Sequence, residues 1–391
     1  MRREPPLPVD GFAVRAVALP GVPEVRAGHD LGALLVDAVA RAGLALRDDD
    51  VLVVASKVVA KAEGRSVRAR SRAAAVEAET VRVVAERTMP GGVTTRVVES
   101  RSGPVLAAAG VDASDVEPGT VLLLPADPDA SARALRARVT ELTGRSPGVV
   151  VSDTTGRPWR VGVADVALGA AGVRALDDVR GEVDRFGRAL EVTVRAVADE
   201  VAALGDLVKG KGAGTPVALV RGLPPVDSTS ASTSTGASEH AVVGGPDGEG
   251  AAGCVRTGPS DWFAYGHVEA VRAALGSPPG AVEAPPLDPA ADSVAARVRR
   301  ALAVATGPGA PVGAAARAPG QGAVLVVVEG GAVEAGVLAE RVRVALWAEG
   351  VEAVTATDRR PRAAGRDGTS STVVTLRAPA APTTAPAPGM L

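Results

Sequence analysis

The feature that most constrains the fold is the regular alternation of short apolar, β-branched runs with helix-like patterns through the first 222 residues. Strands are predicted at residues 51–55, 94–100, 105–108, 121–124, 148–152 and 216–221. Asp127-Pro128-Asp129 predicts the start of a helix at residues 127–142, with Pro near the first turn and acid at the positive end of the helix dipole. Apolar side chains at three- and four-residue steps predict a second helix at residues 190–208. This mixed order favours an α+β (mixed α/β) fold over a helical bundle or a β-sandwich.

Composition determines what kind of core such a fold can have. Hydrophobic residues make up 46% of the 391 residues but aromatic residues only 2%, so the core must be built from Val, Leu and Ala. A chain of this length exceeds one ordinary core, which predicts about two or three domains.

Charge, hydropathy and cysteine content exclude several classes of protein. The net charge is −2 and no long block of Lys and Arg occurs, so we expect no nucleic-acid partner. No run of about 18 uncharged apolar residues and no secretory signal is found, so we expect no membrane span. The single Cys254 cannot form an internal disulfide, which favours the reducing cytoplasm.

The composition changes abruptly after residue 223, where the first domain (residues 1–223) is predicted to end. Residues 224–258 are rich in Ser, Thr, Ala and Gly and predict a flexible linker. A smaller α/β unit follows at residues 259–377, and residues 378–391, rich in Pro, Ala and Thr, predict a disordered tail. Within the smaller unit, helices are predicted at residues 262–275, 292–306 and 333–348, and strands at residues 323–328, 351–356 and 371–376.

Lysine is confined to two pairs near glycines, Lys57 with Lys61 and Lys209 with Lys211, although Lys and Arg together number 43. A codon bias towards Arg explains the shortage, so we expect Lys to survive where Arg cannot replace it. Lys is a compact charge on a flexible stem, whereas Arg is a wide planar fork. The pairs therefore predict an anion site; chance survival is the alternative.

Polar residues at the ends of apolar runs are further candidates for chemistry. Asp153 and Thr154 directly follow the predicted strand at residues 148–152, and Asp112 lies in another polar segment. Carboxylate and hydroxyl oxygens are ligands that Mg²⁺ prefers, but Asp153 and Thr154 alone are equally consistent with a turn or a helix cap. Cations that could neutralise phosphate oxygens are Lys57, Lys61, Arg157 and Arg160.

A dense set of Asp, Glu and Arg residues at positions 177–188 has two interpretations of equal weight. It could form a polar wall that faces a substrate, or a solvated surface of salt bridges. The segment around Gly210 is not a phosphate-binding P-loop, because the required order of residues is missing.

Taken in order, these segments resemble the coenzyme F420-0:γ-glutamyl ligase family, in the two-domain form found in actinobacteria with a shortened C-terminal unit. The resemblance covers residues 12–223. Its motifs include Gly21-Val22-Pro23-Glu24-Val25, Ser56-Lys57-Val58-Val59-Ala60-Lys61, Ala109-Gly110-Val111-Asp112 and Ser152-Asp153-Thr154-Thr155-Gly156-Arg157-Pro158-Trp159-Arg160.

The resemblance implies a GDP-forming ligase that joins L-glutamate to coenzyme F420-0 through a γ-linked amide, by way of an acyl phosphate. GTP would be the co-substrate, and Mg²⁺ or Mn²⁺ the cofactor, with two ions bound and K⁺ as a further candidate. It also implies a homodimer in the cytoplasm.

The resemblance also assigns roles to residues by their positions in the motifs. Metal binding falls to Asp112, Asp153 and Thr154. Within the activity that the resemblance implies, we expect the cations Arg157 and Arg160 to contact the acidic substrates during catalysis. Nucleotide binding falls to Val22, Pro23, Glu24, Val25, Ser56, Lys61, Asp115, Gly210 and Lys211.

Departures from the family pattern keep other functions open. Asp115 stands where the family has Asn, Thr155 replaces a Phe, and Val163 lies in a stretch that is more polar in relatives. They favour, as the alternative, a catalytically silent nucleotide- or coenzyme-binding homologue.

Residues 259–377 resemble a truncated nitroreductase-like unit without recognisable flavin contacts, so we expect no FMN. A third interpretation is a flavin-dependent reductase, which would give a yellow protein.

Overall fold

The computed structural model describes residues 13–114, 116–210, 214–223, 242–243, 250–258, 261–288, 291–307, 314–317, 323–330, 332–351, 353–356 and 372–379. They divide into two compact units, which we describe separately. Unit 1 is drawn from residues up to 81 and from 99 to 256, and unit 2 from residues 82–98 and from 257 onwards. The mixture of helices and strands agrees with the predicted fold class.

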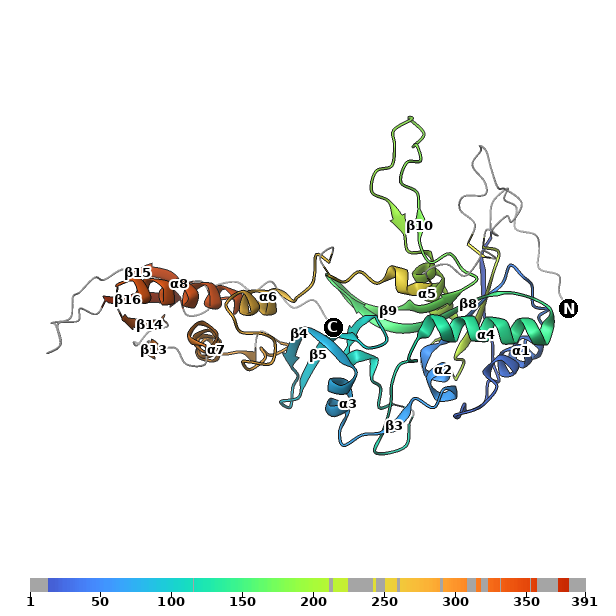
Figure 1. The fold of residues 1–391 in the computed structure, drawn as a ribbon, viewed down its shortest axis with the longest axis horizontal. Helices are drawn as coiled ribbons and strands as arrows, with labels where there is room; N and C mark the ends of the chain where they lie inside the picture. Colours follow the sequence, from blue (N-terminus) through green and yellow to red (C-terminus); the bar gives the residue numbers. More distant parts are fainter. Residues whose placement is uncertain are drawn as a thin grey trace. The chain divides into compact units, whose positions relative to one another are not determined.

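Unit 1 is built on a five-stranded sheet with the strand order β1-β12-β2-β8-β9. Figure 1 labels β8 and β9 of this sheet. β2 pairs with β8 in parallel, and the other neighbours in this sheet are antiparallel. The strands are β1 (Arg15–Ala18), β2 (Val51–Ala55), β8 (Gly148–Arg157), β9 (Arg160–Ala171) and β12 (Val217–Arg221).

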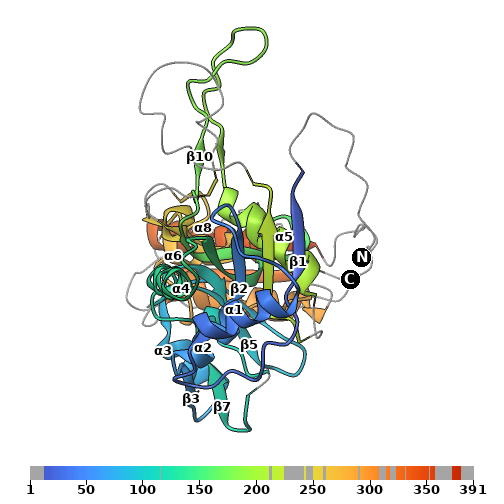
Figure 2. The same ribbon diagram turned by 90° about the vertical axis from the view of Figure 1, so that its right-hand side faces the viewer.

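Helices cover both faces of this sheet, and Figure 2 shows α4 and α5 on opposite sides of β2. Leu52 and Val54 of β2 pack against α1, α2 and α4, whereas Val51 and Val53 pack against α5. A strand buried on both faces reads as an uninterrupted apolar run, which explains the composition of β2. The helices are α1 (Leu31–Arg41), α2 (Ser56–Ala62), α4 (Pro128–Thr143) and α5 (Val197–Lys209).

The core of unit 1 is made of Val, Leu and Ala, as the composition predicted. Gly169 of β9 lies so close to the start of α4 that a Cβ atom there would be 2.0 Å from the Pro128 carbonyl oxygen. Smaller elements complete the unit. β3 (Ser66–Arg68) pairs with β7 (Thr120–Leu122). Between these two strands in the chain lie α3 (Arg72–Ala78), β6 (Val105–Ala107) and the short helix η1 (Ala108–Gly110).

The helix predicted at residues 190–208 was wrong in its first turns, because α5 begins at Val197. Val194 belongs to β11 (Val194–Arg195), which pairs with β10 (Asp177–Asp178). The apolar spacing of Val194 matches a helix, but strand pairing with a distant segment overrides that local preference.

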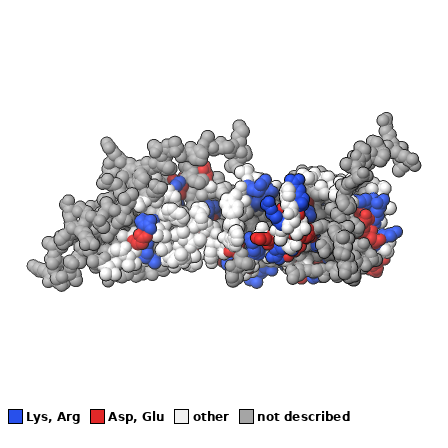
Figure 3. Space-filling view, turned by 90° about the horizontal axis from the view of Figure 1, so that it is seen from above, with Lys and Arg blue, Asp and Glu red and all other residues white. Residues whose placement is uncertain are grey.

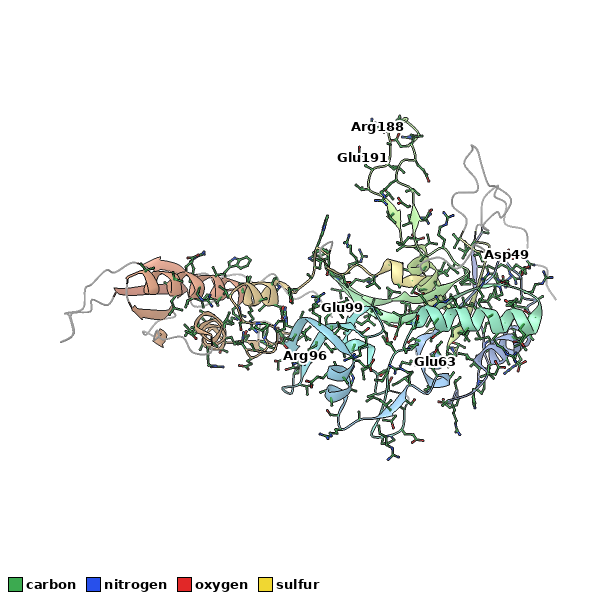
Figure 4. The ribbon with its side chains drawn as sticks, viewed as in Figure 1. Asp49, Glu63, Arg96, Glu99, Arg188 and Glu191 are labelled. Atoms are coloured by element: carbon green, nitrogen blue, oxygen red, sulfur yellow. The ribbon has the colours of Figure 1, made fainter. Side chains whose placement is uncertain are left out.

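Residues 177–195 form an arm that projects from unit 1, with Arg188 and Glu191 near its tip (Figures 1 and 4). Seen from above, basic and acidic side chains lie side by side there (Figure 3). Asp178 pairs with Arg180, and Asp177 pairs with Arg195. Asp177 is buried, but the exposed pair of Asp178 with Arg180 favours the interpretation of this segment as a solvated surface of salt bridges.

Part of the predicted linker is folded into unit 1. Val242, Val243 and Ala251 are buried in the same core as α5. The carboxylate of Asp129 accepts hydrogen bonds from the amides of Ala251 (2.8 Å) and Ala252 (3.0 Å), at the start of the short helix η2 (Ala251–Cys254). Residues 224–241 and 244–249 lie outside the described residues, as do residues 380–391 of the predicted tail.

Unit 2 contains a four-stranded antiparallel sheet with the order β13-β14-β16-β15. Its helices α7 and α8 pack through Val298, Ala301, Val342 and Leu346. The predicted resemblance to a nitroreductase-like domain stays a prediction. Its elements are α6 (His267–Ala274), α7 (Val294–Thr306), β13 (Ala314–Arg317), β14 (Ala323–Gly330), α8 (Ala332–Ala348), β15 (Val354–Ala356) and β16 (Thr372–Pro379), together with most of β4 (Thr80–Thr88) and β5 (Thr94–Ser100).

Among the helices in the described part of the chain, none is both long and apolar enough to span a bilayer.

The packing of residues 250–256 predicts an unreactive thiol. Burial, aided by the charges of Asp199 and Asp129, raises the pKa of Cys254 to about 11 from 9.0. Because each pKa unit lowers the thiolate fraction tenfold, we expect iodoacetamide at pH 8 to alkylate the native protein about a hundredfold more slowly than the urea-unfolded chain. The native rate should keep rising with pH up to about 11. Equal rates at pH 8 would show that this segment does not pack on unit 1.

Candidate functional site

A cavity of about 860 Å³ lies in unit 1, beside the end of β2 and the middle of β8. Lys57, Lys61 and Lys209, all the lysines that the structure describes, line it. Lys211 lies outside the described residues. Lysines far apart in a lysine-poor sequence thus meet at one cavity, which favours an anion site over chance survival.

The cavity also gathers most of the residues singled out from the sequence. Asp115 and Lys211 lie outside the described residues, and Arg157 and Arg160 are not part of the lining. The predicted site residues that line the cavity are Val22, Pro23, Glu24, Val25, Ser56, Lys61, Asp112, Asp153, Thr154 and Gly210.

The parallel pairing of β2 with β8 positions Asp153. Ala55 lies opposite Ser152, so the chain leaves β2 at Ser56 next to Asp153. The Ser56 hydroxyl donates to Asp153 Oδ2 at 2.8 Å, and the Thr154 amide donates to Oδ1 at 2.7 Å. Burial raises the pKa of Asp153 above its ordinary value, because these hydrogen bonds only partly offset the lost solvation.

A left-handed turn positions Asp112. Gly110 has φ of 69°, and a Cβ atom there would be 2.7 Å from the Leu124 side chain, so the turn requires glycine. The backbone of Asp112 then bonds to that of Leu122, N to O at 2.9 Å and O to N at 2.8 Å. These bonds hold the Asp112 side chain at the cavity, as its place in the lining shows.

The carboxylate of Asp112 has two partners. Lys57 Nζ lies 2.5 Å from Oδ2, and the hydroxyl and amide of Ser114 donate at 2.8 and 2.7 Å. Burial acts to raise the pKa of Asp112, but the hydrogen bonds from Lys57 and Ser114 outweigh it, so the pKa lies below its ordinary value. Asp112 therefore faces the cavity as an anion.

Asp165 of β9 is a site residue that the sequence analysis missed. Its Oδ2 accepts from Lys209 Nζ at 3.0 Å and from the Ser152 hydroxyl at 2.9 Å, and its Oδ1 accepts from the Thr154 hydroxyl at 2.7 Å. Burial acts to raise the pKa of Asp165, but the charge of Lys209 and these bonds outweigh it and lower the pKa. A lone Asp in the apolar strand sequence Val-Ala-Asp-Val-Ala was the available signal.

This network controls the hydroxyl of Thr154. Because its proton is directed at Asp165, the Thr154 oxygen can present a lone pair to the cavity. Lys209 lies at the C-terminal end of α5, where the helix dipole favours a cation.

The segment at residues 22–25 forms another part of the wall. Val25 is buried in the core, which anchors the loop, and Glu24 Oε1 accepts from Lys61 Nζ at 2.8 Å. Arg72 also lines the cavity and donates to the Val111 carbonyl oxygen at 3.0 and 2.8 Å.

The two predicted catalytic arginines lie elsewhere on the same strands. Arg157 and Arg160 face each other across the hairpin that joins β8 to β9. Along β8, Arg157 lies three residues beyond Thr154. That spacing corresponds to about 10 Å of extended chain. Arg160 is exposed, and Nε of Arg157 is buried without a hydrogen-bond partner among the described residues.

The donor set fits a particular kind of metal site. Among the described residues, no group of three or more His, Cys, Asp or Glu side chains could by itself hold a metal ion. Asp112, Asp153 and Thr154 supply two carboxylates and a hydroxyl. Mg²⁺ typically binds through one or two carboxylates and completes its coordination with water and substrate phosphates. These residues therefore fit a cation that arrives with a phosphate ligand.

Replacement of Lys209 tests the buried network. Side chains of Lys209 and Asp165 are 5% and 4% exposed, so Lys209→Met leaves a buried carboxylate without its cation. We expect the free energy of unfolding, from urea titration, to fall by about 3–5 kcal/mol. The matched control is Lys57→Met, whose half-exposed ion pair should cost about 1 kcal/mol or less. Equal losses in the two variants would contradict this assignment.

Comparison with known proteins places the chain in a family. A family model described as F420-0:Gamma-glutamyl ligase matches residues 21–222. A protein of Archaeoglobus fulgidus named coenzyme F420:L-glutamate ligase is 43% identical, over 54% of this chain and 88% of its own length. Proteins of the same name from Haloarcula marismortui and Methanopyrus kandleri are 44% and 42% identical, over 52% of this chain and 85% and 84% of their lengths. The matched stretch contains every described residue of the cavity. Because the family model and these relatives match more than half of the chain, the chain belongs to the F420-0:gamma-glutamyl ligase family.

Proposed function

We propose that this protein is a GTP-dependent ligase that joins L-glutamate to coenzyme F420-0 through an amide bond and releases GDP and phosphate. The observation that carries the proposal is the cavity itself, in which three lysines converge with Asp112, Asp153 and Thr154. Its volume of about 860 Å³ suits a small-molecule site. The description of the family supplies the acceptor, coenzyme F420-0, and the names of the relatives supply L-glutamate.

Amide formation needs an activated carboxyl group, because a free carboxylate would have to expel oxide. Transfer of the γ-phosphoryl group of GTP to a carboxylate oxygen of coenzyme F420-0 gives an acyl phosphate and GDP. The amine of L-glutamate then attacks the carbonyl carbon, the C–O bond breaks, phosphate leaves with the electron pair, and the amine loses its proton to solvent. Such a catalyst must align the reactants and neutralise the phosphate charge.

The residues of the cavity match these two tasks. Lys61 and Ser56, with the wall at residues 22–25, would hold the nucleotide. Asp112, Asp153 and Thr154 would hold Mg²⁺ or Mn²⁺, two ions in our proposal, and K⁺ is a further candidate. When bound, divalent cations would neutralise charge on the transferred phosphoryl group.

Arg157 and Arg160 have a role outside the cavity in this proposal. They lie farther along the hairpin, so they would contact the acidic parts of the acceptor and of L-glutamate rather than the triphosphate. We also propose a homodimer. The exposed apolar side chains of Val183 and Phe186 on the arm are candidates for its interface. We also propose that unit 2 binds no FMN.

Turnover is the first test. Purified protein given coenzyme F420-0, GTP, L-glutamate and Mg²⁺ or Mn²⁺ should release phosphate and form a glutamylated product seen by mass spectrometry. Binding of GTP and metal without product, measured by calorimetry, would instead indicate a catalytically silent homologue. A yellow preparation that retains FMN would favour a flavin-dependent reductase.

Asp153→Asn tests the carboxylate in the cavity. Because loss of its charge removes one of the two proposed anionic ligands, we expect kcat/KM to fall at least about a hundredfold. The matched control is Asp178→Asn, since Asp178 pairs with Arg180 on the arm and should leave kcat/KM within about twofold. Similar activity in both variants would contradict the proposed role of Asp153.

A further inference from the structure

Lys57 places a positive charge at the cavity, next to Asp112. Its Nζ lies 2.5 Å from Asp112 Oδ2 and 2.9 Å from the Ser114 hydroxyl oxygen. Its charge also acts to lower the pKa of Asp153, although burial prevails there. One ammonium group thus lies in the field of both carboxylates that the proposed function assigns to a metal.

The ion pair of Lys57 differs from that of Lys209 in the same cavity. The side chains of Lys57 and Asp112 are 39% and 34% exposed, against 5% and 4% for Lys209 and Asp165. Half-exposed pairs contribute little to stability, whereas a buried pair is costly to break. Lys57 also carries its charge on a flexible four-carbon stem. It can therefore leave Asp112 without disturbing the fold, and Lys209 cannot leave Asp165 in this way.

A divalent cation and an ammonium group compete for the same carboxylate oxygen. Binding of a free metal ion at Asp112 must displace Lys57 and leave its charge beside the metal, which is unfavourable at short range. A metal ion that arrives with a triphosphate brings the displaced lysine a new anionic partner. Lys57 should therefore oppose the free metal and favour the metal–nucleotide complex.

We propose that Lys57 is an exchangeable counter-cation that binds Asp112 until a divalent cation arrives with a nucleoside triphosphate, and then moves to the phosphates. This proposal rests on the proposed function, since it assumes a metal ligand in Asp112. It assigns Lys57 a positioning role: it prevents the cavity from filling with metal alone and couples metal binding to nucleotide binding.

Two binding measurements on Lys57→Met test the exchange. Binding of Mn²⁺ alone is followed by the loss of the paramagnetic resonance signal of the free ion. We expect the variant to bind Mn²⁺ about tenfold more tightly than the wild type, because the competing charge is gone. Binding of β,γ-methylene-GTP with Mg²⁺, measured by calorimetry, should weaken about tenfold, because the phosphates lose a cation.

Lys61→Met is the matched control. Lys61 lies on the same helix and lines the same cavity, but it pairs with Glu24 rather than Asp112. This variant should weaken binding of the nucleotide without any gain in affinity for Mn²⁺ alone. Lys57→Gln, which also removes the charge, should behave as Lys57→Met does; circular dichroism checks that all variants are folded.

The outcomes separate this inference from the proposed function. If the wild type binds the analogue with Mg²⁺ but Lys57→Met gains no affinity for Mn²⁺, the exchange is refuted while the proposed function stands. If Mn²⁺ affinity rises equally in the Lys57 and Lys61 variants, the effect is general charge and the exchange is again refuted. If the wild type does not bind the analogue in the presence of either Mg²⁺ or Mn²⁺, the proposed function fails and this inference fails with it.

Discussion

The site depends on the parallel pairing of β2 with β8. A register in which Ala55 faces Ser152 brings Ser56 and Asp153, 97 residues apart in sequence, within a 2.8 Å hydrogen bond. A slip of one residue would turn Asp153 to the other face of the sheet. The register is held by Val and Leu side chains that are buried on both faces, so the hydrophobic core of unit 1 determines the geometry of its polar cavity.

The shortage of lysine acquires a physical meaning in this cavity. Lys209 is enclosed between Ser152 and Asp165, where a wide guanidinium would need more room and more partners. Lys57 and Lys61 follow one another on α2 and reach the cavity from one side. Lys209 is a fixed cation that orders the hydroxyl of Thr154, and Lys61 is also buried, with a side chain 8% exposed. Lys57 is 39% exposed, which suits a charged ligand that comes and goes.

The sequence predicted some of this fold and site directly. The strands predicted at residues 51–55 and 94–100 have the same limits as β2 and β5 in the structure. In both, a run of residues with strong β preference is followed by polar residues, which mark the end of the strand. The aspartates Asp112 and Asp153 were candidates because each follows an apolar run, but their predicted role as metal ligands came from the resemblance to a family. Asp165 was not, since only its pairing with Lys209 and Thr154 across the sheet gives it a role. The start of α5 and the burial of Val242 and Val243 also depend on contacts between distant segments, which local patterns do not encode.

The proposed function requires that Asp112 and Asp153 share one cation-binding cavity with a nucleoside triphosphate. The sharpest test is anomalous diffraction at the manganese edge, from crystals grown with Mn²⁺ and β,γ-methylene-GTP. We expect a manganese peak within bonding distance of the carboxylates of Asp112 and Asp153, with the triphosphate in the same cavity and Lys57 Nζ on a phosphate oxygen. An ordered triphosphate bound elsewhere, with no manganese at these two carboxylates, would contradict it.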